Sequence, residues 1–203
     1  MTLADLADTL PTISLEAGTS VHAAQWPDVS FVIVADGLIV LRSAIPGSAR
    51  RTITCHAGGG SLFLPPGDDE SLVALTPATL VVISSVDRDR LLESPTASRL
   101  LLDGLAETLR QKQAALASMS RLHHVDRVRE KLIELARDHG RVGRDGIRLD
   151  FPLTHDLLGE MTGSARETVT RALDELQREG FVQRRGRTYS VHIPPEELVL
   201  NGR

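Results

Sequence analysis

The chain has 203 residues, of which 41% are hydrophobic, so it exceeds the usual size of one domain and can build more than one core. Its formal net charge of −4 means that binding to a polyanion must depend on where the arginines lie and not on the overall charge. A single cysteine excludes an intrachain disulfide and a four-thiolate iron–sulfur cluster within one subunit, and no apolar run is long enough to span a membrane.

Residues 1–11 carry leucines at helical spacing, namely Leu3, Leu6 and Leu10, with two aspartates between them. The segment lacks the basic start and the cleavage site of a signal peptide. We therefore expect a short docking helix in a cytoplasmic protein.

Residues 15–92 have the pattern of an antiparallel β domain, because short Val, Ile and Leu segments alternate with glycines. The clearest segments are Phe31–Val34, Leu38–Leu41 and Leu80–Ile83. We interpret the region as a jelly-roll-like β-roll with Trp26 and Phe31 in its core. Cys55 and His56 raise haem ligation as an alternative, since both residue types can be axial ligands. Adjacent strand residues point to opposite faces, which favours a buried cysteine beside a surface histidine.

The most regular predicted helix covers residues 95–123, where seam positions recur alternately three and four apart. The residues expected at a dimer interface are Leu102, Leu105, Leu109, Lys112, Leu116 and Met119, and His123 continues the spacing. About 28 residues at 1.5 Å each give roughly 42 Å, which one small domain cannot cover, so a partner helix should bury the seam. Packing within one chain is the alternative. Lys112 at a seam position can fix register and oligomeric state.

A second helix is predicted over residues 125–139. His123 and His124 at the junction could sense pH, although such a pair more often packs or caps. Residues 141–146 are expected to form a loop that leads into a short strand over residues 147–151.

Two short helices separated by a glycine are predicted between Thr154 and Gly180. Thr154 should cap the first helix, and Gly163 should supply the turn. Ser164, with Glu167 three residues on, has the capping-box spacing and should open the second helix. The apolar residues expected inside are Leu157, Leu158 and Met161 in the first helix, and Val169, Ala172, Leu173 and Leu176 in the second.

The opposite face of the second helix carries Arg166, Glu167, Thr170 and Arg171 near its N-terminal end. At about 100° per residue these four span a sector of roughly 140°, in the place where a recognition helix meets base edges. Arginine can pair with guanine O6 and N7, and a carboxylate can accept a hydrogen bond from the amine of cytosine. This face therefore predicts base readout on DNA.

After the second helix, residues 181–184 and 188–191 alternate like two strands around the sequence Arg185-Gly186-Arg187. Such a cationic hairpin tip can hold phosphate. The residues expected to contact the DNA backbone are Thr154, Ser164, Thr168, Arg184, Arg185 and Arg187. A helical hairpin with solvated charges and no ligand is the alternative. The two helices, the glycine turn and the basic hairpin together favour a winged helix-turn-helix.

These residues resemble the CRP/FNR family of bacterial transcription regulators, which is named after the cyclic AMP receptor protein and the fumarate-nitrate regulator. The resemblance rests on Gly163-Ser164-x-Arg166-Glu167-Thr168-Val169-x-Arg171, followed by Leu173, Leu176 and Gly180. It implies that Arg166, Glu167 and Arg171 read a TGTGA-like half-site. It further implies a homodimer on a palindromic operator of double-stranded DNA, with RNA polymerase as a partner.

The resemblance also implies an α+β fold in the family order. An N-terminal antiparallel β-roll sensor domain with a short first helix would cover residues 1–94, a long dimerisation helix residues 95–124, and a C-terminal winged helix-turn-helix domain residues 125–203. A twofold dimer suits half-sites that lie one helical turn apart.

One region departs from the family pattern. Cyclic-nucleotide binders of the family carry Gly-Glu and then Arg-Ser/Thr-Ala in a phosphate-binding cassette, whereas this chain has a glycine run followed by acids, and no arginine between Arg51 and Arg88. The glycines are Gly58, Gly59 and Gly60, and the acids are Asp68, Asp69 and Glu70. Three acids would repel a cyclic phosphate. We therefore expect operator binding that is independent of cyclic nucleotide, with no cofactor and no metal.

Two alternatives stay open. One is a regulator gated by an unidentified small ligand, including haem or a cyclic nucleotide in a non-standard pose, since backbone amides of a glycine run can hold an anion. The other is a small-molecule-binding module that does not act on DNA. An enzyme is not expected, and no catalytic residue is assigned, because the sequence has no nucleophile elbow, P-loop, dinucleotide fingerprint or zinc spacing.

Overall fold

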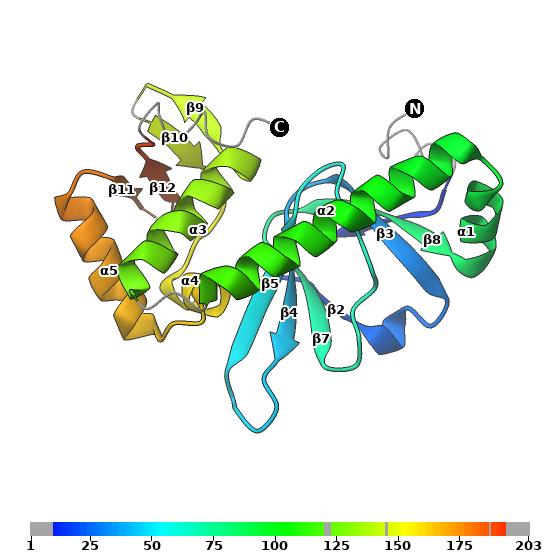
Figure 1. Cartoon of the computed structure of the whole chain (residues 1–203), viewed down its shortest axis with the longest axis horizontal. Helices are drawn as coiled ribbons and strands as arrows, with labels where there is room; N and C mark the ends of the chain where they lie inside the picture. Colours follow the sequence, from blue (N-terminus) through cyan, green and yellow to red (C-terminus); the bar gives the residue numbers. More distant parts are fainter. Residues whose placement is uncertain (1–9, 120–122, 145, 187, 194–203) are drawn as a thin grey trace. The chain divides into compact units, whose positions relative to one another are not determined.

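The computed structural model describes residues 10–119, 123–144, 146–186 and 188–193, and of Arg185 it describes the backbone only. The helix expected over residues 1–11 falls outside the described residues up to Thr9. The chain forms two compact units, one that ends at Leu116 and one that begins at Ala117 (Figure 1).

Two four-stranded antiparallel sheets make up the first unit, in the orders β1-β8-β3-β6 and β2-β7-β4-β5. The strands are β1 (Thr12–Leu15), β2 (Ser20–His22), β3 (Val29–Asp36), β4 (Ile39–Ala44), β5 (Arg51–Ala57), β6 (Leu62–Phe63), β7 (Glu70–Ala74) and β8 (Ala78–Ser84). A short 3-10 helix, Ala23–Gln25, follows β2. The predicted antiparallel β-roll is confirmed.

The alternation along β3 explains how the two sheets and a helix share their cores. Val32 and Val34 belong to a cluster that takes residues from both sheets, while Ile33 between them packs with Leu101 of the long helix. This is the period of two that a strand imposes on its side chains. Trp26 and Phe31, which were predicted core residues, lie partly buried at the edges of the two clusters.

Two helices follow the last strand of this unit, α1 (Ser85–Leu92) and α2 (Pro95–Met119). The β pattern was expected to continue to residue 92. Instead α1 begins directly after Ser84, because the Ser84 hydroxyl accepts a hydrogen bond from the Asp87 amide at 3.1 Å and so caps the helix. α2 matches the predicted long helix from Pro95 as far as Met119, after which residues 120–122 are not described.

The second unit combines three helices with a four-stranded sheet in the order β11-β12-β10-β9. Its elements are α3 (His124–His139), β9 (Arg141–Gly143), β10 (Gly146–Leu149), α4 (His155–Thr162), α5 (Arg166–Arg178), β11 (Val182–Arg185) and β12 (Thr188–Val191). The loop predicted over residues 141–146 is wrong, since β9 and β10 pair as a hairpin in which Gly143 faces Gly146. Gly146 has φ +96°, a conformation that glycine adopts without strain.

Among the described residues, no helix is both long enough and apolar enough to cross a membrane.

Candidate nucleic-acid interface

The first short helix of the second unit begins and ends as its sequence predicts. The Thr154 hydroxyl accepts a hydrogen bond from the Leu157 amide at 3.1 Å and caps α4. Gly163 ends the helix in the left-handed region with φ 63°. Gly159 is required as well, because a Cβ atom there would lie 2.7 Å from the carbonyl oxygen of Ser164. The predicted apolar residues of α4 and α5 are all buried, namely Leu157, Leu158, Met161, Val169, Ala172, Leu173 and Leu176.

The start of α5 differs from the prediction. Its N-cap is Ala165, without a side-chain hydrogen bond, so the capping box of Ser164 and Glu167 is wrong. The Ser164 side chain is buried, and its oxygen lies 3.3 Å from His124 Nδ1 and 3.4 Å from Arg127 Nη2. The hydroxyl is thus bonded inside the unit, and a phosphate contact by Ser164 stays a prediction.

Arg127 is a buried residue that the sequence analysis did not single out. Its side chain donates from Nη1 to the carbonyl oxygen of Met119 at 3.0 Å, while Nη2 contacts Ser164 and His124. The last turn of α2 is therefore tied to the turn before α5. Arg127 lies directly before Val128 in the buried stripe of α3, and only the three-dimensional contacts distinguish it from an exposed arginine.

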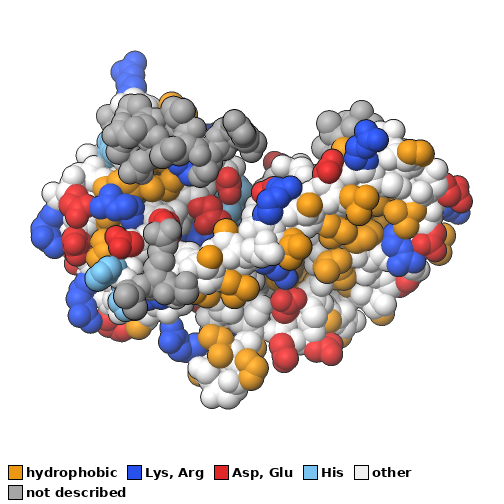
Figure 2. Space-filling view, viewed as in Figure 1, with side chains coloured by type: hydrophobic (Ala, Val, Ile, Leu, Met, Phe, Trp, Pro, Cys, Tyr) orange, Lys and Arg blue, Asp and Glu red, His pale blue; other side chains and the backbone are white. Residues whose placement is uncertain are grey.

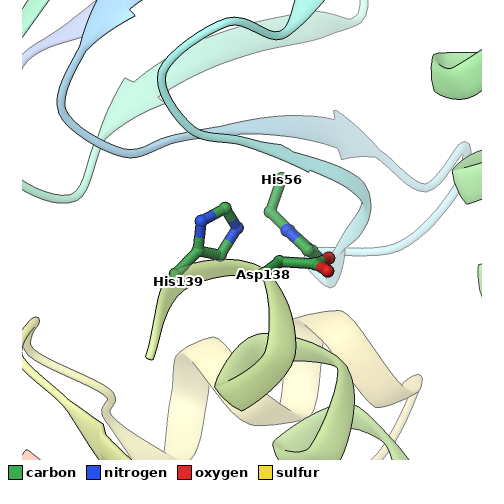
Figure 3. A group of neighbouring side chains, drawn as sticks. All are labelled: His56, Asp138 and His139. Carbon is green, nitrogen blue, oxygen red and sulfur yellow. The ribbon is translucent and has the colours of Figure 1, made fainter. Parts of the chain in front are cut away.

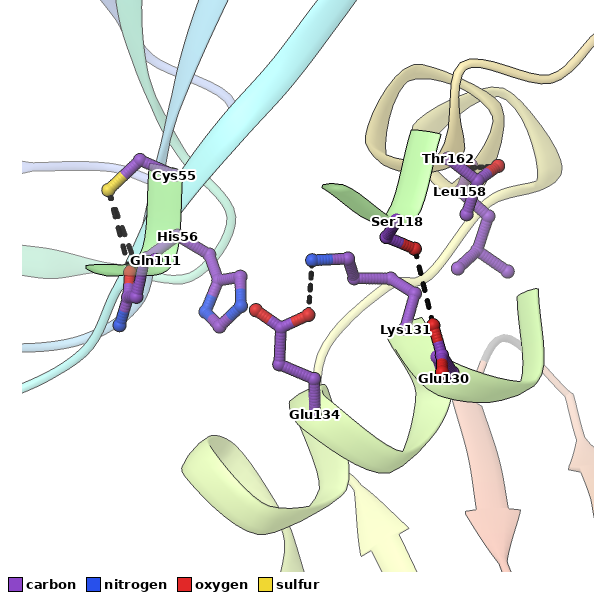
Figure 4. Close-up of polar contacts among 9 residues, drawn as sticks. All are labelled: Cys55, His56, Gln111, Ser118, Glu130, Lys131, Glu134, Leu158 and Thr162. Atoms are coloured by element: carbon purple, nitrogen blue, oxygen red, sulfur yellow. Dashed lines mark hydrogen bonds and ion pairs between the residues drawn. The ribbon is translucent and has the colours of Figure 1, made fainter. Parts of the chain in front are cut away.

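Two further polar contacts involve residues of α3. Lys131 is buried and pairs with Glu134, and the Ser118 hydroxyl donates to Glu130 at 3.4 Å (Figure 4). A buried ammonium is costly unless it is paired, which explains why Lys131 keeps a carboxylate partner on its own helix.

The outer face of α5 carries the predicted base-reading residues. Arg166, Glu167 and Arg171 are exposed, and Thr168 is half-buried. Arg166 Nη1 lies 3.5 Å from Asp156 Oδ2 on α4, with side chains that are 65% and 64% exposed. Such an exposed ion pair contributes little and can be exchanged for a ligand.

Thr170, the fourth predicted base-reading residue, is engaged within the protein. Its hydroxyl lies 3.0 Å from the carbonyl oxygen of Arg166 and 2.8 Å from Nδ1 of His155 on α4. His155 was not predicted as a site residue, and only the packing of α4 against α5 brings it to this face.

The predicted basic hairpin is formed by β11 and β12, with Gly186 at its tip at φ +64°. Arg184 is exposed and donates from Nε to the carbonyl oxygen of Gly186 at 3.0 Å. The side chain of Arg185 and all of Arg187 lie outside the described residues. Arg129 of α3 stacks over the Phe181 ring at 4.4 Å and fixes the start of the hairpin.

A cleft of about 310 Å³ opens where α4, α5 and this hairpin meet. Its polar lining consists of Thr154, His155, Asp156, Arg166, Arg184 and Tyr189. Partial burial lowers the pKa of His155, and Arg184 and Arg166 lower it further, against smaller opposing effects of Asp174 and Asp156. Burial raises the pKa of Tyr189, which keeps its phenol protonated.

The exposed face of α2 is another candidate interface. Leu102, Leu109 and Leu116 lie seven residues apart and are 66%, 58% and 62% exposed. Figure 2 shows hydrophobic side chains gathered along this helix. Leu105 was predicted to lie in the same seam, but its side chain is partly buried against the core of the first unit. Lys112 and Met119 are half-buried.

The first unit contains a cavity of about 200 Å³ between β5, the glycine run and α2. Cys55 Sγ lies 3.7 Å from Oε1 of Gln111 (Figure 4). The Thr108 hydroxyl donates to the Leu62 carbonyl. Glu107 is the one charged residue among those that line the cavity.

The glycine run forms a tight turn in which the amides of Gly60 and Ser61 are bonded within the protein. The Ser61 amide donates to the Gly58 carbonyl at 3.0 Å, and the Gly60 amide donates to the Val34 carbonyl at 2.8 Å. Gly60 has φ +86°, as the third residue of such a turn requires. These two amides are therefore not available to an anion.

Cys55 and His56 are both buried, so the expected surface position of His56 is wrong. The last three residues of β5 are buried whichever face they occupy. Figure 3 labels His56 of β5, and it labels Asp138 and His139 at the C-terminal end of α3. The ring of His139 packs edge-on against Phe151, with 6.5 Å between the ring centroids.

Residues 126–197 match the Crp-like helix-turn-helix domain. Together with the relatives below, this match supports a regulator of the CRP/FNR family. Its fold is similar to that of FixK2 from Bradyrhizobium japonicum, with a TM-score of 0.75 and 18% identity over 91% of this chain and 93% of that one.

Curated CRP/FNR relatives are transcription regulators and not enzymes. The global nitrogen regulator of Synechocystis sp. is 34% identical over 124 residues, which are 60% of this chain and 55% of that protein. The CRP-like cAMP-activated global transcriptional regulator of Mycobacterium tuberculosis is 26% identical over 93% of this chain and 87% of that protein. This chain therefore matches little more than half the length of the nitrogen regulator.

Proposed function

We propose that this CRP/FNR protein regulates transcription as a homodimer that binds a palindromic, TGTGA-like operator. The observation that carries the proposal is the exposed set of Arg166, Glu167 and Arg171 on the first turns of α5, beside the basic hairpin that holds Arg184. Arginines and a carboxylate at these positions suit guanine and cytosine edges in the major groove. Phosphate contacts from Thr154, Thr168, Arg184, Arg185 and Arg187 would fix the register without specifying sequence. A contact with RNA polymerase stays a prediction.

The proposed dimer rests on the exposed leucine stripe of α2. Leucines at seven-residue spacing are the pattern of a helix pair, and a single chain leaves them in water. A second copy of α2 related by a twofold axis would cover the same residues on both helices. The dimer would then present two copies of α5 to the two half-sites.

Selection of bound DNA from a random pool tests the proposed function. We expect enrichment of TGTGA-like inverted repeats with centres one helical turn apart, and an affinity that falls steeply with salt because phosphates are neutralised. A pool that remains random would contradict the proposal and would favour a small-molecule-binding module that does not act on DNA.

We propose that operator binding does not need a cyclic nucleotide. Glu107 is the one charged residue among those that line the cavity beside β5, and the amides of Gly60 and Ser61 already have protein partners. This lining therefore lacks the cation that would make charge-assisted contacts to a cyclic phosphate. Titration of the protein onto its operator, with and without cyclic AMP or cyclic GMP, should give the same affinity. A tenfold gain with either nucleotide, worth about 1.4 kcal/mol, would contradict the proposal.

The cavity itself supports one alternative, a regulator gated by a different small ligand. Its lining offers a thiol, a hydroxyl, an amide and a carboxylate from Cys55, Thr108, Gln111 and Glu107. A ligand can shift the operator affinity only if it binds the two states differently. Operator binding by the purified protein without any added molecule would favour the ligand-independent form.

A further inference from the structure

The cleft between α4, α5 and the hairpin combines two cations with a histidine. Arg166 and Arg184 both line it, as does His155 on the first turn of α4. The other charged groups that act on His155 are Asp156 on α4 and Asp174 on α5, and Tyr189 of β12 lines the same cleft. In the free protein the two arginines and partial burial oppose a charge on the imidazole, and so hold its pKa below the ordinary value.

The hydrogen bonds of Thr170 decide what His155 can offer to a ligand. A threonine hydroxyl has one proton, and within a helix it is commonly donated to the carbonyl four residues earlier, here that of Arg166. Thr170 then accepts from Nδ1–H of His155. In a neutral ring of this tautomer, Nε2 carries a lone pair, which would repel a phosphate oxygen in the cleft.

We propose that His155 takes up a proton when a DNA phosphate enters this cleft, so that operator binding strengthens as the pH falls. The inference rests on the proposed function. It adds a phosphate contact by a titrating side chain to the base contacts proposed for α5. Protonation turns Nε2 into a donor while Nδ1–H keeps its bond to Thr170. The imidazolium can then make a charge-assisted hydrogen bond to the phosphate.

The sign of the pH dependence follows from the charges. A phosphate in the cleft offsets the field of Arg166 and Arg184 and adds a negative charge near the ring, so the pKa of His155 is higher in the complex than in the free protein. The added affinity is fully present below the pKa of the free protein and is lost as the pH rises through the pKa of the complex. Each unit of difference between the two pKa values makes the association constant about tenfold larger per subunit.

Binding of the full-length protein to its selected operator should be measured from about pH 5.5 to pH 8, around the ordinary range of histidine, at constant ionic strength. Wild-type affinity should fall across this range, and calorimetry in two buffers of different ionisation enthalpy should show net proton uptake. In His155→Gln, whose amide can still hydrogen-bond but cannot titrate, most of the slope and of the uptake should disappear. His123→Gln is the matched control, because His123 is an exposed histidine of the same unit and its side chain makes no capping bond. It should behave like the wild type.

If His155→Gln keeps the wild-type pH slope and proton uptake, the inference is overturned. The proposed function would still stand in that case, because the variant would have bound the operator in the same measurement. If the selection yields no operator, the proposed function itself fails. A measurement on the wild type avoids any folding defect of the variant, namely NMR titration of the His155 ring in the free and operator-bound protein. Its pKa should rise on binding, and an equal or lower value in the complex would contradict the inference.

Discussion

Leu109→Asp and Leu116→Asp are each expected to convert the proposed dimer into monomers and to remove tight operator binding. A twofold axis would place two copies of the new carboxylate at the interface, where a buried and unpaired charge costs several kilocalories per mole. If the two carboxylates together cost about 5 kcal/mol, the dissociation constant of the dimer rises by roughly three to four orders of magnitude. Sedimentation of the variants at concentrations where the wild type is dimeric measures this directly.

Ala114→Asp is the matched control for these two variants. Ala114 is exposed on α2. At about 100° per residue, its position is about 140° around the helix axis from that of Leu109. It adds the same charge to the same helix away from the leucine stripe, so it should leave the dimer intact. Dimeric Leu109→Asp and Leu116→Asp proteins with normal operator affinity would mean that the stripe is not the subunit interface.

The second large effect concerns base readout by α5. Arg166→Ala or Arg171→Ala should cost about 1–3 kcal/mol and relax specificity at one base pair of each half-site, because each would remove a proposed two-bond contact to guanine. Glu167→Ala should lose the discrimination for cytosine. Competition between the operator and its single-base variants, measured by gel shift, gives the specificity of each protein.

Arg184→Ala provides the contrast, because Arg184 lies on the hairpin and not on α5. Its loss should weaken binding to all sequences by a similar factor and reduce the salt slope by about one per subunit. Arg185→Ala and Arg187→Ala are expected to act in the same way. If variants of α5 and of the hairpin lost specificity equally, the division between base-reading and phosphate-binding residues would be wrong.

Local sequence patterns predicted the parts of this fold that depend on local interactions. The cap at Thr154, the glycine turn at Gly163 and the buried stripe of α5 all follow from spacing within one or two turns of helix. The exposed positions of Arg166 and Arg171 follow from the same periodicity, which is why the outer face of α5 could be named in advance.

Contacts between distant segments could not be predicted in this way. Ser164 has the spacing of a capping box, yet the guanidinium of Arg127 and the ring of His124 draw its hydroxyl inward. His155 reaches the interface only because α4 packs across α5, which places it beside Thr170. The register of β9 against β10 likewise depends on a pairing of strands that a run of arginine and glycine does not signal.

The contacts of Arg127 bear on where the second unit can be separated from the first. A fragment that begins at Ala117 keeps the Met119 carbonyl that accepts from the guanidinium, and keeps Ser118 beside Glu130. A fragment that begins at residue 125 removes both, and leaves a nearly buried cation without one of its acceptors. The end of the long helix is thus part of the folding unit that carries α5, and the shorter fragment would be the less stable of the two.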